Sequence, residues 1–261
     1  MLARSPTLQA RLLPKGWLDV LRQVALFGIA YMGYSLVRGA ANGKAAAAFT
    51  HAREVISVER TLHFFVEPSV QTWASGSHFV AGTASWIYVN AQTSVTIGAL
   101  VFLYLFRNRS FYFVRNMFLV AMVLALLGYI VFPTAPPRFM PEWGFFDSVS
   151  DVTGVAQDNS SVNAFFNAYA AVPSMHVGFA VMVGLSLFKL VRFPAVRVFW
   201  LLYPLLITFV TVATANHFLA DAILGAVTAG AAAYVARWLA RTRPNAWRFA
   251  PPAAAEARAA A

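Results

Sequence analysis

The sequence predicts an all-α polytopic membrane protein with six transmembrane helices. Of its 261 residues, 59% are hydrophobic and only 11% are charged, whereas an ordinary soluble domain has about 25% charged residues. The apolar residues gather in runs of about 20, the length that crosses a hydrocarbon core roughly 30 Å thick. Strands are not expected, because the alternating pattern of a membrane barrel does not occur and the backbone inside lipid must satisfy its own hydrogen bonds.

The expected spans are bounded by charged residues or by proline. They lie at residues 18–37, 79–106, 111–132, 174–190, 196–214 and 217–238. The first span could alternatively be a cleaved signal peptide, but its apolar core is longer than a typical secretory one and Arg38 follows it directly. We therefore expect an uncleaved anchor.

The remaining segments are expected to lie outside the bilayer. Between residues 45 and 75, apolar and charged side chains alternate in loosely helical spacing, which predicts an amphipathic helix at the membrane surface. Segment 133–172 is a long polar loop, and loops of that length are commonly functional or disordered. The predicted organisation is a cytoplasmic N-terminal segment (1–17), a six-helix membrane domain (18–240) and a disordered cytoplasmic tail (241–261).

The charged residues are distributed unequally between the two sides of the predicted bundle. With the N-terminus in the cytoplasm, the inner segments carry 15 basic and two acidic residues, whereas the outer segments carry five basic and eight acidic residues. This asymmetry predicts the orientation through the positive-inside rule. It also accounts for the net charge of +10, so we expect no nucleic-acid partner. The sequence has no cysteine, which excludes disulfides and thiol catalysis.

The residues with catalytic potential gather at the predicted outer ends of three helices. They are Arg138 in Pro-Thr-Ala-Pro-Pro-Arg, Ser174 and His176 in Pro-Ser-Met-His, and Asn216, His217 and Asp221 in Asn-His-Phe-Leu-Ala-Asp. Three segments that are far apart in the sequence therefore bring two imidazoles, a carboxylate and a guanidinium to one leaflet.

The spacing of His217 and Asp221 favours a functional pair. On one helix, residues four apart share a face, so the carboxylate could accept a proton from one ring nitrogen. The other nitrogen would then be unprotonated, as a nucleophile or a base requires. A single histidine near a membrane interface is more commonly a packing residue, but a pair with aspartate is costly to bury in apolar surroundings.

The other two motifs have a structural and a functional interpretation. Pro173 and Ser174 are typical of a helix start, which would place His176 in a first turn whose N–H groups can bind an anion. Ser174 could equally be a plain helix cap, and Arg138 could be an interfacial residue. Two His and an Asp are plausible zinc ligands, but the neighbouring arginine would repel a cation. We expect no metal and no other cofactor.

Together with the six-span plan, these three motifs resemble the type 2 phosphatidic acid phosphatase (PAP2) superfamily over about residues 18–238. The resemblance implies a metal-independent attack by His217 on phosphorus, which gives a phosphohistidine, with Asp221 orienting the ring. It also implies that His176 protonates the leaving oxygen and then deprotonates the incoming water or alcohol. The residues implied to hold the phosphoryl oxygens are Arg138, Ser174 and Asn216.

Two positions depart from the family pattern. The first motif usually has a lysine seven residues before its arginine, where this chain has Val131. The third motif usually has an arginine six residues before its nucleophilic histidine, where this chain has Thr211. The remaining pattern looks closer to the inositol phosphorylceramide synthase-like branch, which transfers phosphoryl-headgroup units between lipids. A phosphodiester carries less charge than a monoester, so it would need fewer cations.

We therefore expect an integral enzyme of a bacterial plasma membrane that cleaves the phosphate ester of a lipid on the outer face. A lipid phosphotransferase is the alternative. A lipid transporter is less favoured, because the ionisable residues gather at one interface rather than at mid-membrane, and so is a non-catalytic lipid-binding protein. The expected partners are a phosphorylated lipid substrate and the membrane lipids, whereas headgroup, acceptor and oligomeric state are not predicted.

Overall fold

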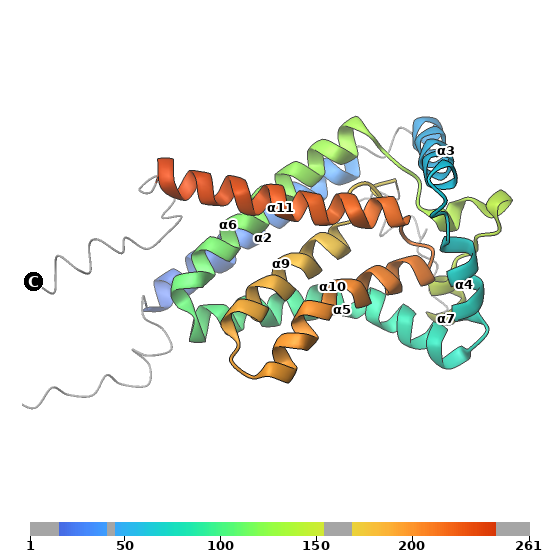
Figure 1. The fold of residues 1–261 in the computed structure, drawn as a ribbon. Coiled ribbons are helices and arrows are strands. Elements are labelled where there is room, and N and C mark those ends of the chain that lie inside the picture. Colours follow the sequence, from blue (N-terminus) through green and yellow to red (C-terminus); the bar gives the residue numbers. More distant parts are fainter. Residues whose placement is uncertain (1–15, 41–44, 154–168, 244–261) are drawn as a thin grey trace, which may run out of the picture.

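The computed structural model describes residues 16–40, 45–153 and 169–243, which form a bundle of helices with a helical cap at one end (Figure 1). Nearly all of the predicted N-terminal segment and most of the predicted tail lie outside the described residues. The described part is all-helical, as predicted, and its one extended feature is an isolated bridge between Thr134 and Ala170.

All six predicted apolar segments are helices. They are α2 (Gly16–Ala40), α5 (His78–Phe106), α6 (Asn108–Val131), α9 (Met175–Leu190), α10 (Pro194–Ala213) and α11 (Leu219–Thr242). Four of them, α5, α6, α10 and α11, are long and apolar enough to cross a membrane. Helix α9 is a shorter apolar helix of 16 residues, about 24 Å long. A bilayer crossing by α2 and by α9 is therefore a proposal.

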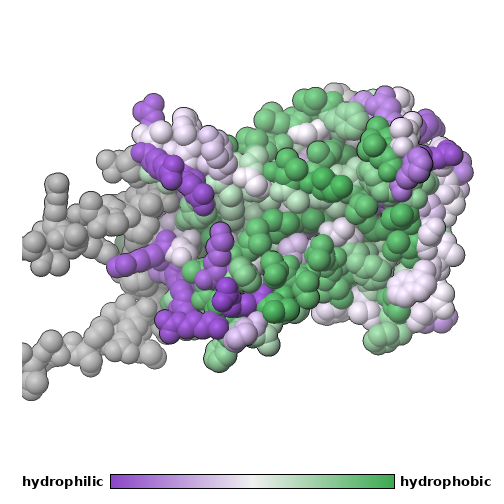
Figure 2. All heavy atoms as spheres, in the orientation of Figure 1, coloured by the Kyte–Doolittle hydropathy of each residue, from purple (hydrophilic) through white to green (hydrophobic). Residues whose placement is uncertain are grey.

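The surface of the bundle is apolar between two polar ends. Figure 2 shows hydrophobic side chains across the middle of one face and hydrophilic side chains at both ends. Large hydrophobic side chains such as Phe79, Ile97, Leu205 and Tyr234 are more than half exposed on the long helices. A continuous apolar surface of this kind is suited to contact with lipid.

Small residues allow the start of α9 to lie very close to two other helices. A Cβ atom on Gly128 of α6 would lie 2.6 Å from the Cδ of Pro173, and a Cβ atom on Gly225 of α11 would overlap the carbonyl oxygen of Ser174. Glycine is therefore required at both positions for this close approach. The consequence is that the start of α9 is held against α6 and α11.

The cap consists of short helices that cover the end of the bundle where α9 and α11 begin (Figure 1). They are α3 (Ala45–Thr61), α4 (Glu67–Ser75), η2 (Pro137–Phe139), η3 (Pro141–Trp143) and α7 (Ser148–Thr153). One amphipathic helix was predicted over 45–75, but the chain forms two helices, α3 and α4, and their position at the membrane surface stays a prediction. The break follows from His63, which has a positive φ of 62°, a conformation that ends helices.

The apolar stripe of α3 packs on protein. Ala48, Ala52, Ile56 and Glu59 are fully buried, and they follow the three- and four-residue spacing of one helix face. The three apolar side chains share a core with Met140 and Phe218, among others. This face therefore attaches the cap to the loop that follows α6 and to the turn that precedes α11.

Candidate active site

The two histidines singled out by the sequence come together beneath the cap. The ring centroids of His176 and His217 are 5.6 Å apart, and their planes are inclined by 58°. His176 lies in the first turn of α9, where the hydroxyl of Ser174 accepts the N–H of Val177 at 3.4 Å. The predicted helix start is thus confirmed. Ser174 itself is fully buried and acts as a cap, so its role in phosphate binding stays a prediction.

His217 lies in a tight turn between α10 and α11, not on α11 as the sequence predicted. Ala215 adopts a positive φ of 51°, which is uncommon for a residue with a Cβ and is found at functional turns. The N–H groups of Asn216 and His217 both donate to the carbonyl oxygen of Thr211, over 3.0 and 3.2 Å. The turn is therefore fixed by its own backbone, and His217 is only 5% exposed.

The predicted pair of His217 and Asp221 is present, although it forms across the start of the helix. The Nδ1 atom of His217 lies 3.4 Å from Oδ2 of Asp221. The same oxygen accepts the N–H of Phe218 at 2.9 Å, and the N–H of Ser174 donates to the backbone oxygen of Asp221 at 3.0 Å. When the proton is on Nδ1, Nε2 of His217 is unprotonated, as a nucleophile requires.

Arg138 is held on the same turn. Its NH1 group donates to Oδ1 of Asn216, and its backbone N–H donates to the oxygen of Ala215 at 2.8 Å. Its Nε atom is 4.0 Å from a carboxylate oxygen of Asp147 but makes no hydrogen bond. The structure thus brings Arg138 and Asn216, both predicted to bind phosphate, beside His217, where they contact each other.

Three functional candidates were missed by sequence reasoning. Tyr88 of α5 stacks on the ring of His176, with centroids 4.5 Å apart and planes inclined by 22°. Glu59 and Glu67 are fully buried and accept the N–H groups of Ala220 at 2.7 Å and Leu219 at 2.8 Å. Glu59 carried a signal, because it continues the apolar stripe of α3, whereas Tyr88 lies in a long apolar helix that gives none.

The two positions that depart from the family pattern differ in their surroundings. Val131 is 75% exposed at the end of α6. Thr211, in contrast, is fully buried, and its hydroxyl donates to the oxygen of Thr208 at 3.0 Å. The arginine that the family usually has at position 211 would be buried next to the His217 turn. Threonine at this position therefore affects the charge of the site more directly than valine at the exposed position 131.

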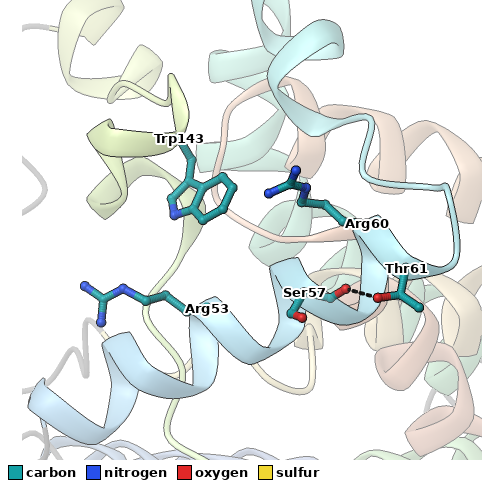
Figure 3. A pocket seen from close by; sticks show the side chains of 5 residues that line it. All are labelled: Arg53, Ser57, Arg60, Thr61 and Trp143. Atoms are coloured by element: carbon teal, nitrogen blue, oxygen red, sulfur yellow. Dashed lines mark hydrogen bonds between the residues drawn. The ribbon is translucent and has the colours of Figure 1, made fainter.

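Two further features bear on the chemistry. Within the described residues, no group of three or more His, Asp or Glu side chains could hold a metal ion. A hollow of about 450 Å³ lies on α3, lined by Arg53, Ser57, Arg60, Thr61 and Trp143 (Figure 3). Arg53 pairs with Glu142 at 3.7 Å, and the Arg60 guanidinium lies 5.3 Å from the Trp143 ring. Neither histidine lines this hollow.

Sequence comparison assigns the family. Residues 53–235 match the PAP2 superfamily, a span that includes Arg138, both histidines and Asp221. The chain belongs to the PAP2 superfamily. No curated protein and no solved structure matches the sequence. Members of this superfamily are generally phosphoric ester hydrolases, and the four long apolar helices indicate that this PAP2 protein is a membrane protein.

Proposed function

We propose that this PAP2 protein is a lipid phosphate phosphatase that forms a phosphohistidine on His217 and works without a metal ion. The observation that carries the proposal is the 5.6 Å separation of the His176 and His217 rings, because one phosphoryl group placed there would contact both. A nucleophile and a proton donor supplied from two different helices are the parts that phosphoryl transfer needs.

The reaction proceeds in two steps. Nε2 of His217 attacks phosphorus, the bond from phosphorus to the lipid oxygen breaks, and His176 donates a proton to that oxygen. Water, deprotonated by His176, then attacks the phosphohistidine, and inorganic phosphate leaves. Asp221 stabilises the positive charge of the His217 ring through the contact at Nδ1.

The charges around the two helix starts favour one location for the phosphate. The first turn of α9 has a hydroxyl cap and no acidic residue, whereas the first N–H groups of α11 already bind carboxylates. An anion is stabilised at a helix N-terminus whose N–H groups can face it. We therefore place the phosphoryl oxygens between the start of α9 and the Arg138 guanidinium. Asn216 would hold that guanidinium, because its own amide nitrogen already donates to Thr214.

The substrate is proposed to reach this site from the outer leaflet of a bacterial plasma membrane. In this arrangement α2 and α9 also cross the bilayer, which gives six spans with the histidines at the outer end. The opposite end of the bundle carries basic residues at the ends of α6, α9 and α11, including Arg109, Lys189 and Arg241. Basic residues are enriched on the cytoplasmic side, which supports the orientation.

A second candidate function is a lipid phosphotransferase of the inositol phosphorylceramide synthase type. The observation that favours it is that Val131 and Thr211 are uncharged, whereas the family usually has a lysine and an arginine at these two positions. A phosphodiester substrate carries less charge than a monoester and would need fewer cations. In that reaction a lipid alcohol, rather than water, accepts the phosphoryl-headgroup unit from His217.

The test compares wild type, His217→Ala and Asp221→Asn, purified in detergent. The substrates are phosphatidic acid, a prenyl diphosphate and a phosphodiester lipid, the last supplied together with a lipid alcohol as acceptor. We expect release of phosphate in the presence of EDTA, near-complete loss in His217→Ala and partial loss in Asp221→Asn. A new phospholipid without free phosphate would favour the phosphotransferase. Equal turnover by His217→Ala, or EDTA inhibition that zinc reverses, would overturn the proposed mechanism.

A further inference from the structure

The first turn of α11, directly after His217, is held by three carboxylates. The backbone N–H groups of residues 218, 219 and 220 donate to Asp221, Glu67 and Glu59 over 2.9, 2.8 and 2.7 Å. The first N–H groups of a helix have no partner within the helix itself. Here side chains from α3, α4 and α11 satisfy three of them in succession, which fixes the direction in which the chain leaves His217.

The two glutamates interact with each other, and no cation pairs with either of them among the described residues. Both are fully buried. In each, Oε1 accepts a backbone N–H, whereas the buried Oε2 has no hydrogen-bond partner. Two ionised carboxylates in this position would repel each other, and only the two backbone N–H groups would offset that repulsion. A proton on one of them would supply a donor for the other.

The surrounding charges favour this proton. The charged groups that act on Glu59 are Glu67 at the start of α4 and Asp221 in α11, and both are acidic. Burial and then the charge of Glu67 raise the pKa of Glu59 from its ordinary value of 4.5 to about 9. This direction favours a proton on Glu59, which would supply the donor that Oε2 of Glu67 lacks.

We propose that Glu59 and Glu67 are positioning residues, which share one proton and hold the His217 turn in its reactive geometry through the backbone of Leu219 and Ala220. This inference rests on the proposed function, because it assumes that His217 is the nucleophile. The glutamates themselves touch the backbone two and three residues after His217, so they act on the reaction only through the placement of that ring.

Substitution by glutamine and by alanine tests the geometry. In Glu59→Gln or Glu67→Gln, the amide oxygen can still accept the backbone N–H and the amide nitrogen can donate to the remaining carboxylate. We therefore expect each single glutamine variant to keep kcat within about twofold of wild type. The double variant has two amide donors facing each other, and the alanine variants lose the backbone acceptor. In these we expect kcat to fall between about ten- and a hundred-fold, with little change in KM.

Glu54→Gln is the matched control, because Glu54 is exposed on the same helix and the change removes the same charge. It should match wild type in kcat and KM at every pH. The proposal is overturned if Glu59→Ala and Glu67→Ala keep the wild-type kcat, or if the glutamine and alanine variants lose it equally.

The pH dependence of thermal stability tests the shared proton without any catalytic assay. The pKa of Glu59 is raised from 4.5, its ordinary value, to about 9 in the folded protein. The protonated carboxyl therefore contributes its full stabilisation below pH 4.5, and this stabilisation is lost as the pH rises towards about 9. The Tm of wild type should therefore fall relative to that of Glu59→Gln across this interval. A constant Tm difference would overturn the shared proton. If His217→Ala remained active, the proposed function would fail, while this measurement would still decide the state of the pair.

Discussion

Two buried polar clusters lie at opposite ends of the bundle, and they differ in how fully their hydrogen bonds are satisfied. The tyrosine cluster lies where α2, α5 and α6 meet and contains Asp19, Gln23, Tyr104, Tyr112, Arg115 and Asn116. The histidine cluster lies under the cap and contains Glu59, Glu67, Arg138, Asn216, His217 and Asp221. Both bury charged side chains in an otherwise apolar helical protein.

In the tyrosine cluster nearly every buried polar side-chain atom has a hydrogen-bond partner. Asp19 accepts the hydroxyls of Tyr112 at 2.6 Å and Tyr104 at 3.0 Å, and Arg115 donates to Gln23 at 2.7 Å. One buried side-chain atom there, Nδ2 of Asn116, has no partner. A polar network of this kind stabilises one arrangement of its helices.

The histidine cluster leaves four buried atoms without a hydrogen bond. They are Oε2 of Glu59, Oε2 of Glu67, Nε of Arg138 and Oδ1 of Asp221. Each such atom costs about 1–3 kcal/mol, so a purely structural cluster would be expected to satisfy them. This difference supports the proposal that the first cluster serves stability and the second serves substrate binding and catalysis.

Among the substitutions that test this comparison of the two clusters, the largest effect is expected from Arg138→Ala. This change removes the guanidinium proposed to bind the phosphoryl oxygens, so kcat/KM should fall about a hundred-fold. The measurement is phosphate release from phosphatidic acid at several substrate concentrations. The control is Arg53→Ala, which removes an exposed arginine of α3 and should have little effect on kcat/KM. Equal losses of kcat/KM in both variants would contradict a specific role of Arg138 in phosphate binding.

The close approach of α9 and α11 is tested by Gly225→Ala. The new Cβ would overlap the backbone oxygen of Ser174, so the two helix starts must separate, at a cost of about 1–3 kcal/mol in the free energy of unfolding. The separation should also lower kcat about tenfold, since it moves His176 away from His217. Gly230→Ala, on the same helix with no atom within 4 Å of its Cβ, should keep both. Full activity in Gly225→Ala would contradict the placement of the site.

The tyrosine cluster should respond in the opposite way. Asp19→Asn weakens the hydrogen bonds from Tyr104 and Tyr112, which should lower the free energy of unfolding by about 1–2 kcal/mol. Because this cluster is far from the histidines, kcat and KM should stay at wild-type values. Thermal unfolding in detergent, followed by an activity assay on the intact protein, checks both. A selective loss of kcat with unchanged stability would break the distinction between the two clusters.

The smallest effect is expected at Tyr88. Replacement by phenylalanine keeps a ring stacked on His176 and should leave kcat nearly unchanged. Tyr88→Ala removes the stack, which is worth about 1 kcal/mol, so kcat should fall roughly fivefold. Steady-state kinetics of the two variants separate the ring from the hydroxyl. A larger loss in Tyr88→Phe would instead point to a role for the hydroxyl.

The long helices and the three motifs could be predicted from the sequence because length, apolarity and local spacing determine them. The positions of turns could not. His63 and Ala215 adopt positive φ values without the glycine that usually signals them, so the break in 45–75 and the start of α11 after His217 were missed. The contacts of Glu59 and Glu67 with α11 join residues more than 150 positions apart, and no local pattern predicts such a contact.

The most direct test of the account is to identify the covalent intermediate. Wild type and His176→Ala are mixed with an aryl phosphate ester, whose leaving group needs no proton, quenched rapidly and mapped by peptide mass spectrometry. The account predicts one acid-labile phosphoryl group on His217, which accumulates in His176→Ala because water is no longer deprotonated. Turnover with no phosphorylated His217, or a phosphoryl group on Ser174 instead, would contradict it.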